Sequence, residues 1–247
     1  MKALSAEYEQ VSLKDKRKPH EGIVKTLNSL KGRALRYIYE SSYKIRDEEL
    51  QYILPALQTI NMITHIDLRI SDQGATLIGE FLKNDGYTQI LNLQGNNINR
   101  RGAQAIANAL KANTFLTSIS LADNSIGEGG GMAFAEMLQV NVTLEHLNLS
   151  NSDLETDSLI ALLTILRYNP SLKSIDISRP IPLFHHTNWM DDVAIHIAQM
   201  LEKNDVLQEL HLQKFEIRDY GFQWICEKMQ HNHSLVYLDL SWFVEPL

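Results

Sequence analysis

The residue of this sequence with the most reactive side chain is Cys226, the only cysteine among 247 residues. A catalytic thiol needs partial exposure and an electropositive setting. Cys226 instead occupies a position in a helical pattern that other segments fill with apolar residues. These residues are Ala107, Ala135, Leu163 and Ala198. The pattern therefore predicts that Cys226 is a core residue and not a nucleophile. A single cysteine forms no internal disulfide, which favours a reducing intracellular compartment.

A cluster of glycines is the second candidate for chemistry, because backbone N–H groups at a helix start can bind a phosphate. The cluster consists of Gly127 and the run Gly129, Gly130 and Gly131. The Gly-Lys-Ser/Thr end of a phosphate-binding loop does not follow it. The segment is also in register with residues 99–103, which lie 28 residues earlier. We therefore interpret these glycines as part of a structural repeat.

A third group combines residue types that bind metals. It consists of His185, His186, Asp191, Asp192 and His196. Two adjacent histidines in a polar loop do not match the ligand spacing of common zinc sites. We therefore predict neither a metal site nor a bound cofactor.

These residues belong to a repeated pattern, Leu-x-x-Leu-x-Leu-x-x-Asn-x-Ile, which is followed each time by a helical stretch. Its clearest copy is Leu116, Ile119, Leu121, Asn124 and Ile126. We use the second apolar residue of each copy as its anchor. The anchors are Ile38, Ile66, Leu91, Ile119, Leu147, Ile175, Leu210 and Leu238. Successive anchors are 28, 25, 28, 28, 28, 35 and 28 residues apart.

Each copy is predicted to form a strand and then a helix. Residues two apart, such as Ile119 and Leu121, point to the same side of a strand. In the stretch after the anchor Leu91, Ala103, Ala107 and Leu110 have the spacing of a buried helical stripe. Such units cannot bury their apolar face alone, so neighbouring units must stack. The sequence thus predicts an α/β solenoid with about eight strands in a curved parallel sheet inside and helices outside.

Polar residues mark the predicted helix ends. Acids or amides near the helix starts can accept hydrogen bonds from free backbone N–H groups. They are Asp47, Asp72, Asn99, Asp191 and Asp219. A second set stands three residues before the next strand, where we predict left-handed residues that terminate the helices. This set is Asp85, Asn113, Asn141, Asn169, Asn204 and Asn232.

The chain divides into a leader and a repeat domain. Residues 1–34 are predicted to be a basic leader and capping segment, since residues 1–46 carry eleven Lys or Arg against five Asp or Glu. The leader is either a solvated arm or a targeting signal. Residues 35–247 form the repeat domain, with an insertion near residues 179–190 and an incomplete last repeat.

The 28-residue step, the Asn-x-Ile turn and the Gly-Ala-x-x-Ile-Ala-x-x-Leu of residues 102–110 resemble the ribonuclease-inhibitor-like class of leucine-rich repeats. The resemblance covers about residues 35–240 and implies the α/β solenoid fold. More narrowly, residues 176–181, the longer loop after them and residues 201–212 look like one subfamily of this class. That likeness implies an intracellular protein of the nucleus, nucleolus or cytoplasm, or alternatively of the cilium axoneme, with no known catalytic residues.

The strand alternation also predicts the side chains of the concave face, a surface that solenoid proteins use for binding. They are Tyr37, Tyr39, His65, Asp67, Arg69, Asn92, Gln94, Ser118, Ser120, His146, Asn148, Ser150, Ser174, Asp176, Ser178, Glu209, His211, Gln213, Tyr237, Asp239 and Ser241. Aromatic and charged residues gather at the two ends of this face, where we predict the partner contacts. At about 4.8 Å per strand its histidines are too far apart to share a metal. Its carboxylates are on separate strands and suggest no acid/base pair.

Two further segments are candidates for partner contacts. Extra residues in a regular solenoid emerge as a loop, so the insertion offers Phe184 and Trp189. Alternatively, the apolar residues of this loop pack against the neighbouring helix. At the other segment, the strand at Leu235–Leu240 is followed by only seven residues and no helical pattern. We expect a bare sheet edge that self-associates or binds a partner through residues 235–247, including Trp242, unless the tail folds back as its own cap.

The sequence therefore predicts a non-catalytic protein-binding scaffold that has protein partners and no small-molecule substrate. Its longest apolar stretches, such as Leu159–Leu163, are far shorter than the ~20 residues of a membrane helix. One arginine and several acids on the concave face argue against an extended nucleic-acid site. The alternatives are a GTPase-activating protein of the Ran-activator type, a class that uses these repeats, and a structural component of a ciliary assembly.

Overall fold

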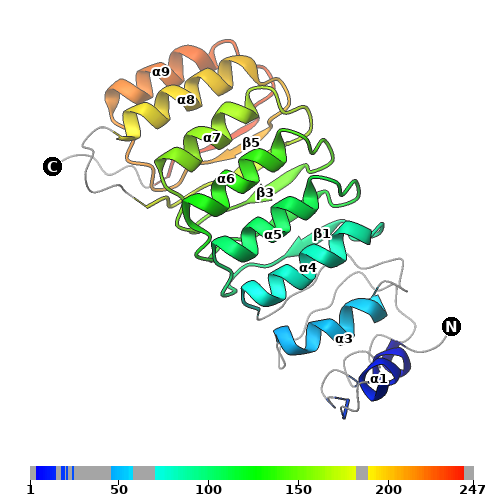
Figure 1. Ribbon diagram of the computed structural model, residues 1–247. Coiled ribbons are helices and arrows are strands. Elements are labelled where there is room, and N and C mark those ends of the chain that lie inside the picture. Colours follow the sequence, from blue (N-terminus) through cyan, green and yellow to red (C-terminus); the bar gives the residue numbers. More distant parts are fainter. Residues whose placement is uncertain are drawn as a thin grey trace.

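The computed structural model describes residues 4–14, 18–19, 21, 24, 46–57, 70–181 and 189–241. Its helices are α1 (Leu4–Lys14), α3 (Asp47–Leu57), α4 (Asp72–Asn84), α5 (Arg100–Leu110), α6 (Gly127–Leu138), α7 (Thr156–Leu166), α8 (Trp189–Lys203) and α9 (Asp219–Met229). Its strands are β1 (Ile90–Asn92), β2 (Ser118–Ser120), β3 (His146–Asn148), β4 (Ser174–Asp176), β5 (Glu209–His211) and β6 (Tyr237–Asp239). From α4 onward helices and strands alternate, and helices α4–α9 lie side by side in one layer (Figure 1).

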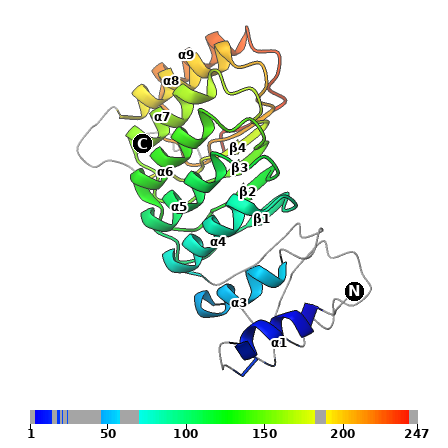
Figure 2. The ribbon, with the colours of Figure 1, turned by 45° about the vertical axis from the view of Figure 1, so that its right-hand side comes forward.

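The six strands form one parallel sheet in the order β1 to β6. Each strand pairs with the next so that one predicted anchor lies beside another, for example Leu91 beside Ile119 and Ile119 beside Leu147. The helices cover one side of this sheet, as the turned view shows (Figure 2). The predicted α/β solenoid is therefore confirmed. Its first two predicted anchors, Ile38 and Ile66, lie outside the described residues.

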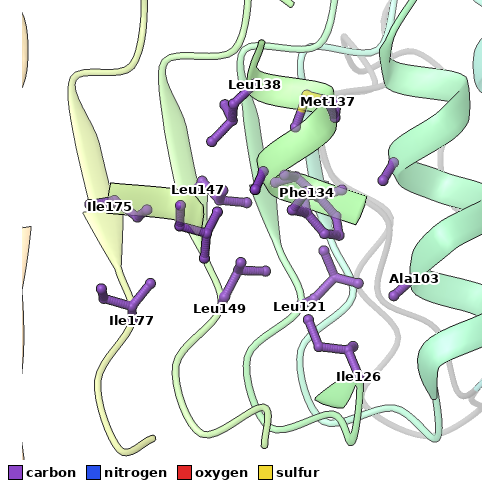
Figure 3. Close-up of a cluster of buried hydrophobic side chains, with 14 of the residues drawn as sticks. Ala103, Leu121, Ile126, Phe134, Met137, Leu138, Leu147, Leu149, Ile175 and Ile177 are labelled. Atoms are coloured by element: carbon purple, nitrogen blue, oxygen red, sulfur yellow. The ribbon is translucent and has the colours of Figure 1, made fainter. Parts of the chain in front are cut away.

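The core lies between the sheet and the helices. Anchor residues such as Ile119 and the residues two positions later, such as Leu121, are at most 2 % exposed in β1 to β5. Figure 3 shows how a helix fills the space over these strands: Phe134 of α6 points toward Leu121 and Leu147. Phe134 is completely buried. Burying a large apolar side chain contributes about 1.5–3 kcal/mol, so each stacked repeat adds substantially to stability.

The asparagines that precede the strands do not have the predicted conformation. Positive φ angles in the described chain occur at other residues, so Asn113, Asn141, Asn169, Asn204 and Asn232 are not left-handed terminators. Their side chains are instead hydrogen-bonded between repeats. The amide of Asn141 donates to the carbonyl of Leu110 (2.7 Å) in the preceding repeat. Its oxygen accepts from the backbone N–H of Leu144 (2.8 Å), so the amide satisfies helix-end carbonyls that would otherwise lack a donor.

Two of the predicted capping acids act on the following repeat. Asp47 accepts from the backbone N–H of Ser71 (2.9 Å) just before α4, while α4 itself is capped by the Ser71 side chain. Asp72 accepts from the N–H groups of Asn99 (2.7 Å) and Gly102 (2.9 Å), at the start of α5. These acids accept from free backbone N–H groups as predicted, but the groups belong to the next repeat, so the acids join successive helices. Asn99, at the N-cap of α5, makes no side-chain cap hydrogen bond.

The prediction that Cys226 is a core residue is also wrong. Its counterparts Ala107, Ala135, Leu163 and Ala198 are fully buried or nearly so. Each of these four residues lies in a helix that has another described helix on its far side. Cys226 lies in α9, beyond which the structure describes no further helix, and its side chain is exposed.

Candidate partner-binding face

The concave face is the face of the sheet that points away from helices α4–α9. Its side chains alternate with core residues as predicted: Ser118 and Ser120 are half-buried, whereas Ile119 between them is buried. The same alternation holds in β1 to β5. In β6 the anchor Leu238 is itself only half-buried. The sequence therefore places the described residues on the correct side of the sheet, while their contact with a partner stays a prediction.

One row of side chains crosses the face at the residue before each anchor. Strand pairing places Ser118, His146, Ser174, Glu209 and Tyr237 in this row. His146 and Glu209 are exposed, and the Tyr237 side chain is 49 % exposed. Ser118 and Ser174 flank His146 in this row, whereas Glu209 and Tyr237 are adjacent.

A second row consists of the residue after each anchor. Several of its side chains accept hydrogen bonds from the loop that follows the strand. The side chains of Asn92, Asp176 and Asp239 each accept a hydrogen bond from the backbone N–H two residues further on, at 2.9–3.0 Å. Asn148 accepts in the same way from Ser150 (2.9 Å). These are Asx turns, which fix the chain where it leaves the strand. Because part of each side chain is committed to its own loop, this row is less free to reach a partner than the first.

A group of interacting side chains on the concave face lies at β5 and β6. The His211 ring stacks at a tilt of 41° on the Tyr237 ring, with 5.0 Å between their centroids. His211 Nδ1 lies 3.9 Å from an oxygen of Asp239, and Gln213 donates to the same carboxylate at 2.6 Å. The Gln213 hydrogen bond, together with the backbone N–H of Ser241, holds the pKa of Asp239 below its ordinary value. Asp239 therefore stays negative in this group, beside the exposed Glu209.

Sequence reasoning missed a row of loop residues that borders the face. They share a left-handed backbone four residues after the anchor. They are Gly95, Asp123, Asn151, Arg179 and Lys214, with φ between 50° and 66°. Glycine and asparagine tolerate this conformation, so Gly95 and Asn151 could have indicated the left-handed positions from the sequence.

Within this row Asp123 is held from both sides. Gln94 and Asn151 each donate to one of its carboxylate oxygens at 2.8 Å. These two hydrogen bonds lower the pKa of Asp123 from its ordinary value. Asp123 therefore contributes a fixed negative charge to this row, which also contains the basic residues Arg179 and Lys214.

Some of the predicted partner contacts lie outside the described residues, and one, Trp189, lies inside the core. Those outside the described residues are Tyr37, Tyr39, His65, Asp67, Arg69, Phe184 and Trp242. Trp189 begins α8 and is only 8 % exposed, within the hydrophobic core. The surface role predicted for Trp189 is therefore wrong, and the alternative of packing against a neighbouring helix fits it.

The glycine cluster has a packing role. A side chain at Gly129 would collide with the guanidinium of Arg100, and a Cβ at Gly131 would lie 2.6 Å from the Cβ of Ser158. The glycines thus allow α6 to approach both neighbouring helices. The same lack of side chains leaves a hollow of about 600 Å³ between α5 and α6, lined by Arg100, Glu128 and Glu136 among others.

The described residues contain no group of three or more His, Cys, Asp or Glu placed to hold a metal ion. His185 and His186 lie outside them. A search of the described helices finds none with the length and apolar character needed to cross a membrane.

Comparison with protein families agrees with this architecture. The family model described as leucine-rich repeat matches residues 89–107, 112–135 and 140–163. Each match includes one strand and at least part of the helix that follows it. The chain therefore contains leucine-rich repeats in this region and has an α/β solenoid fold.

Among curated proteins, the chain is similar to leucine-rich repeat-containing protein 34. It is 43 % identical to the Mus musculus protein over 51 residues, which are 21 % of this chain and 12 % of that protein. It is 37 % identical to the Homo sapiens protein over 66 residues, or 27 % of this chain and 13 % of that protein. The matched region thus spans about an eighth of the length of these relatives.

Two solved structures are similar to this chain at low identity and with TM-scores below 0.5. The leiomodin-1 actin-binding site 2 structure is 20 % identical, with a TM-score of 0.45 over 75 % of this chain and 87 % of that chain. The tropomodulin C-terminal domain of Caenorhabditis elegans is 12 % identical, with a TM-score of 0.48 over 74 % of this chain and 92 % of that chain. At these identities the likeness concerns the fold alone.

Proposed function

We propose that this chain is a non-catalytic scaffold that binds a partner protein on its concave face, centred on strands β3 to β6. The observation that carries the proposal is the exposed row of His146, Glu209 and Tyr237, held in fixed register by the parallel sheet. Interfaces obtain most of their affinity from a few such anchors, with tyrosine among the enriched types. The short side chain of Ser174 separates His146 from Glu209 in this row.

The electrostatics of this region favour a partner surface with basic groups. Glu209 is exposed, and hydrogen bonds keep Asp239 in its charged form. Among strand residues 90–92, 118–120, 146–148, 174–176, 209–211 and 237–239 there is no lysine or arginine, while Arg179 and Lys214 lie in the loops that border the face. Complementary charge increases the rate of association and the discrimination between partners.

The experiment compares two sets of variants of the full chain in affinity purification from cells that express it. One set changes His146, Glu209 and Tyr237 together to alanine. The control set changes Asp157 and Tyr168 to alanine, because both are exposed on α7 or its end, away from the concave face. The proposal expects a direct partner that the control set retains and the first set loses.

The partner recovered in this way is then purified and titrated against both sets. Loss of three anchors should weaken binding by about 2 kcal/mol or more, which is roughly thirtyfold in Kd. Equal affinity of wild-type and concave-face variants, with unchanged circular dichroism, would show that the partner binds elsewhere.

A further inference from the structure

Two carboxylates on the concave face of β5 and β6 have no lysine or arginine partner in the described structure. Glu209 is exposed, and its side chain makes no hydrogen bond or ion pair with the described residues. The Asp239 side chain is only 11 % exposed, and the one described basic group within 4 Å of it is His211, at 3.9 Å. Charges with so little contact with water are usually paired with an opposite charge. The two acids therefore favour a cation from outside the chain.

Tyr237 lies beside both carboxylates. Strand pairing places it next to Glu209 on β5, at the strand spacing of about 4.8 Å. Asp239 is two residues further along β6, so it projects to the same side of the sheet. The Tyr237 ring contacts the His211 ring, with 5.0 Å between their centroids. Tyr237 is nevertheless 49 % exposed. The ring is thus held by a neighbour and still offers surface to a partner.

This combination of side chains suits a guanidinium group better than other groups. A guanidinium is planar, binds a carboxylate through two parallel N–H donors and stacks on aromatic rings. A lysine ammonium is a more strongly hydrated point charge, so it gains less from the ring. An apolar side chain placed there would take Glu209 out of water without giving it a partner, which costs free energy.

The chain's own basic residues lie elsewhere on this side of the sheet. Arg179 and Lys214 stand in the loops that border the concave face, four residues after their anchors. Glu145, the residue just before β3, differs from Glu209 because it has a lysine partner, Lys173, at 2.8 Å. The sheet therefore pairs one of these carboxylates within the chain and leaves Glu209 open to a partner.

We propose that Glu209, Tyr237 and Asp239, called here the tyrosine site, bind an arginine side chain of the partner protein. The guanidinium stacks on Tyr237 and accepts the carboxylate of Glu209 as its hydrogen-bond partner, while the charge of Asp239 attracts it. His211 is a positioning residue that holds the Tyr237 ring. This inference rests on the function proposed above, and it narrows a basic partner surface to one type of residue.

The probes are two fluorescein-labelled peptides of equal charge, (Gly-Arg)4 and (Gly-Lys)4, and fluorescence anisotropy at 0.15 M salt measures their binding to the full chain. One variant combines Glu209→Gln with Asp239→Asn. Its control combines Glu128→Gln with Asp157→Asn, which removes two exposed acids from the first turns of α6 and α7 and so changes the net charge equally.

A second pair of variants tests the aromatic ring. Tyr237→Leu removes the ring from the tyrosine site, and its control is Tyr168→Leu, at a residue that is 78 % exposed after α7. Glu209→Gln alone serves as a milder variant, because Glu209 is exposed and its loss leaves the hydrogen bonds of Asp239 in place. Circular dichroism checks that each variant keeps its fold.

We expect the arginine peptide to bind more tightly than the lysine peptide. Glu209→Gln with Asp239→Asn should weaken its binding about tenfold and Glu209→Gln alone about threefold, because charge-assisted hydrogen bonds are lost. Tyr237→Leu should remove the preference for arginine, while both controls change binding less than about twofold.

Equal weakening by the two double variants would overturn the proposal, because the peptides would then respond only to net charge. Equal affinity of wild-type protein for the two peptides, or no binding at millimolar concentration, would overturn it as well. If the concave-face alanine variants still lose their protein partner in that case, the scaffold function stands and only the arginine is excluded. Loss of both results would exclude the concave face itself.

Discussion

An asparagine before each of the strands β2 to β6, buried at β2 to β5 and half-buried at β6, joins two successive repeats through its side-chain amide. Asn141 donates to Leu110 and Asn113 in the preceding repeat and accepts from Thr143 and Leu144 in its own. Its counterparts Asn113, Asn169, Asn204 and Asn232 repeat this arrangement. At the residue scale, therefore, a polar side chain inside the molecule connects repeats whose other contacts are mainly apolar.

We predict that Asn141→Ala lowers the free energy of unfolding by about 2 to 4 kcal/mol, because it leaves buried backbone groups without partners. Asn141→Gly should be as harmful, since Asn141 is not left-handed and glycine restores no hydrogen bond. The control is Asp153→Gly, at a residue with φ of 60°, where we expect a change below about 0.5 kcal/mol. Urea denaturation decides between them, and a harmless Asn141→Gly would restore the left-handed interpretation.

The stability of the protein should depend on pH through Asp123, and the direction of its pKa shift gives the direction of this dependence. Hydrogen bonds from Gln94 and Asn151 lower its pKa in the folded state. Its stabilising effect is thus present above the unfolded value of about 3.9 and is lost as pH falls through the lower folded pKa. We predict that Asp123→Ala destabilises the protein at pH 7 and has a smaller effect near pH 2, as measured by the urea midpoint. An equal loss at both pH values would contradict this account.

At the scale of elements, β1 to β5 each contain one buried residue, and the residue two positions later is buried as well, so both hold the strand to the helix layer. We predict that Leu121→Ala, at a completely buried position, lowers stability by about 2 to 5 kcal/mol through the cavity it creates. Ser120→Ala, its neighbour on the concave face, should change stability far less because Ser120 is half-buried and packs little. Denaturant unfolding of both variants tests the strand register. A tolerant Leu121 beside a sensitive Ser120 would mean that the register is off by one residue.

The strands could be predicted because their anchors recur at a fixed spacing, which burial of one face imposes on every repeat. The anchors Leu91, Ile119, Leu147, Ile175, Leu210 and Leu238 all lie in strands. The exposure of Cys226 could not be read from the same periodicity, because burial of a repeat position depends on the next element and not on the pattern itself. For Asn141 the hydrogen-bond partner lies 31 residues earlier, so local sequence showed the position but not its role. The concave face followed from strand alternation, whereas its Asx turns and left-handed border depend on backbone geometry.

At the scale of the whole molecule, parallel stacking converts one short repeat into a rigid surface. Six strands in sequence order place His146, Glu209 and Tyr237 at fixed separations across the sheet, while helices α4–α9 occupy the other side (Figure 2). Scaffolds of this kind bind through extended surfaces that no single repeat could provide.

The central claim is that partners bind on the concave face, and site-specific photocrosslinking tests it most directly. The photoreactive residue p-benzoylphenylalanine replaces Tyr237 in one protein and Tyr168 in the other, two exposed tyrosines of which only Tyr237 lies on that face. Both proteins are irradiated in cells that express them, and the crosslinked products are identified by mass spectrometry. We predict a discrete crosslinked partner at Tyr237 that is absent at Tyr168. The same partner crosslinked at Tyr168 and not at Tyr237 would place binding on the helical side and contradict the proposed function.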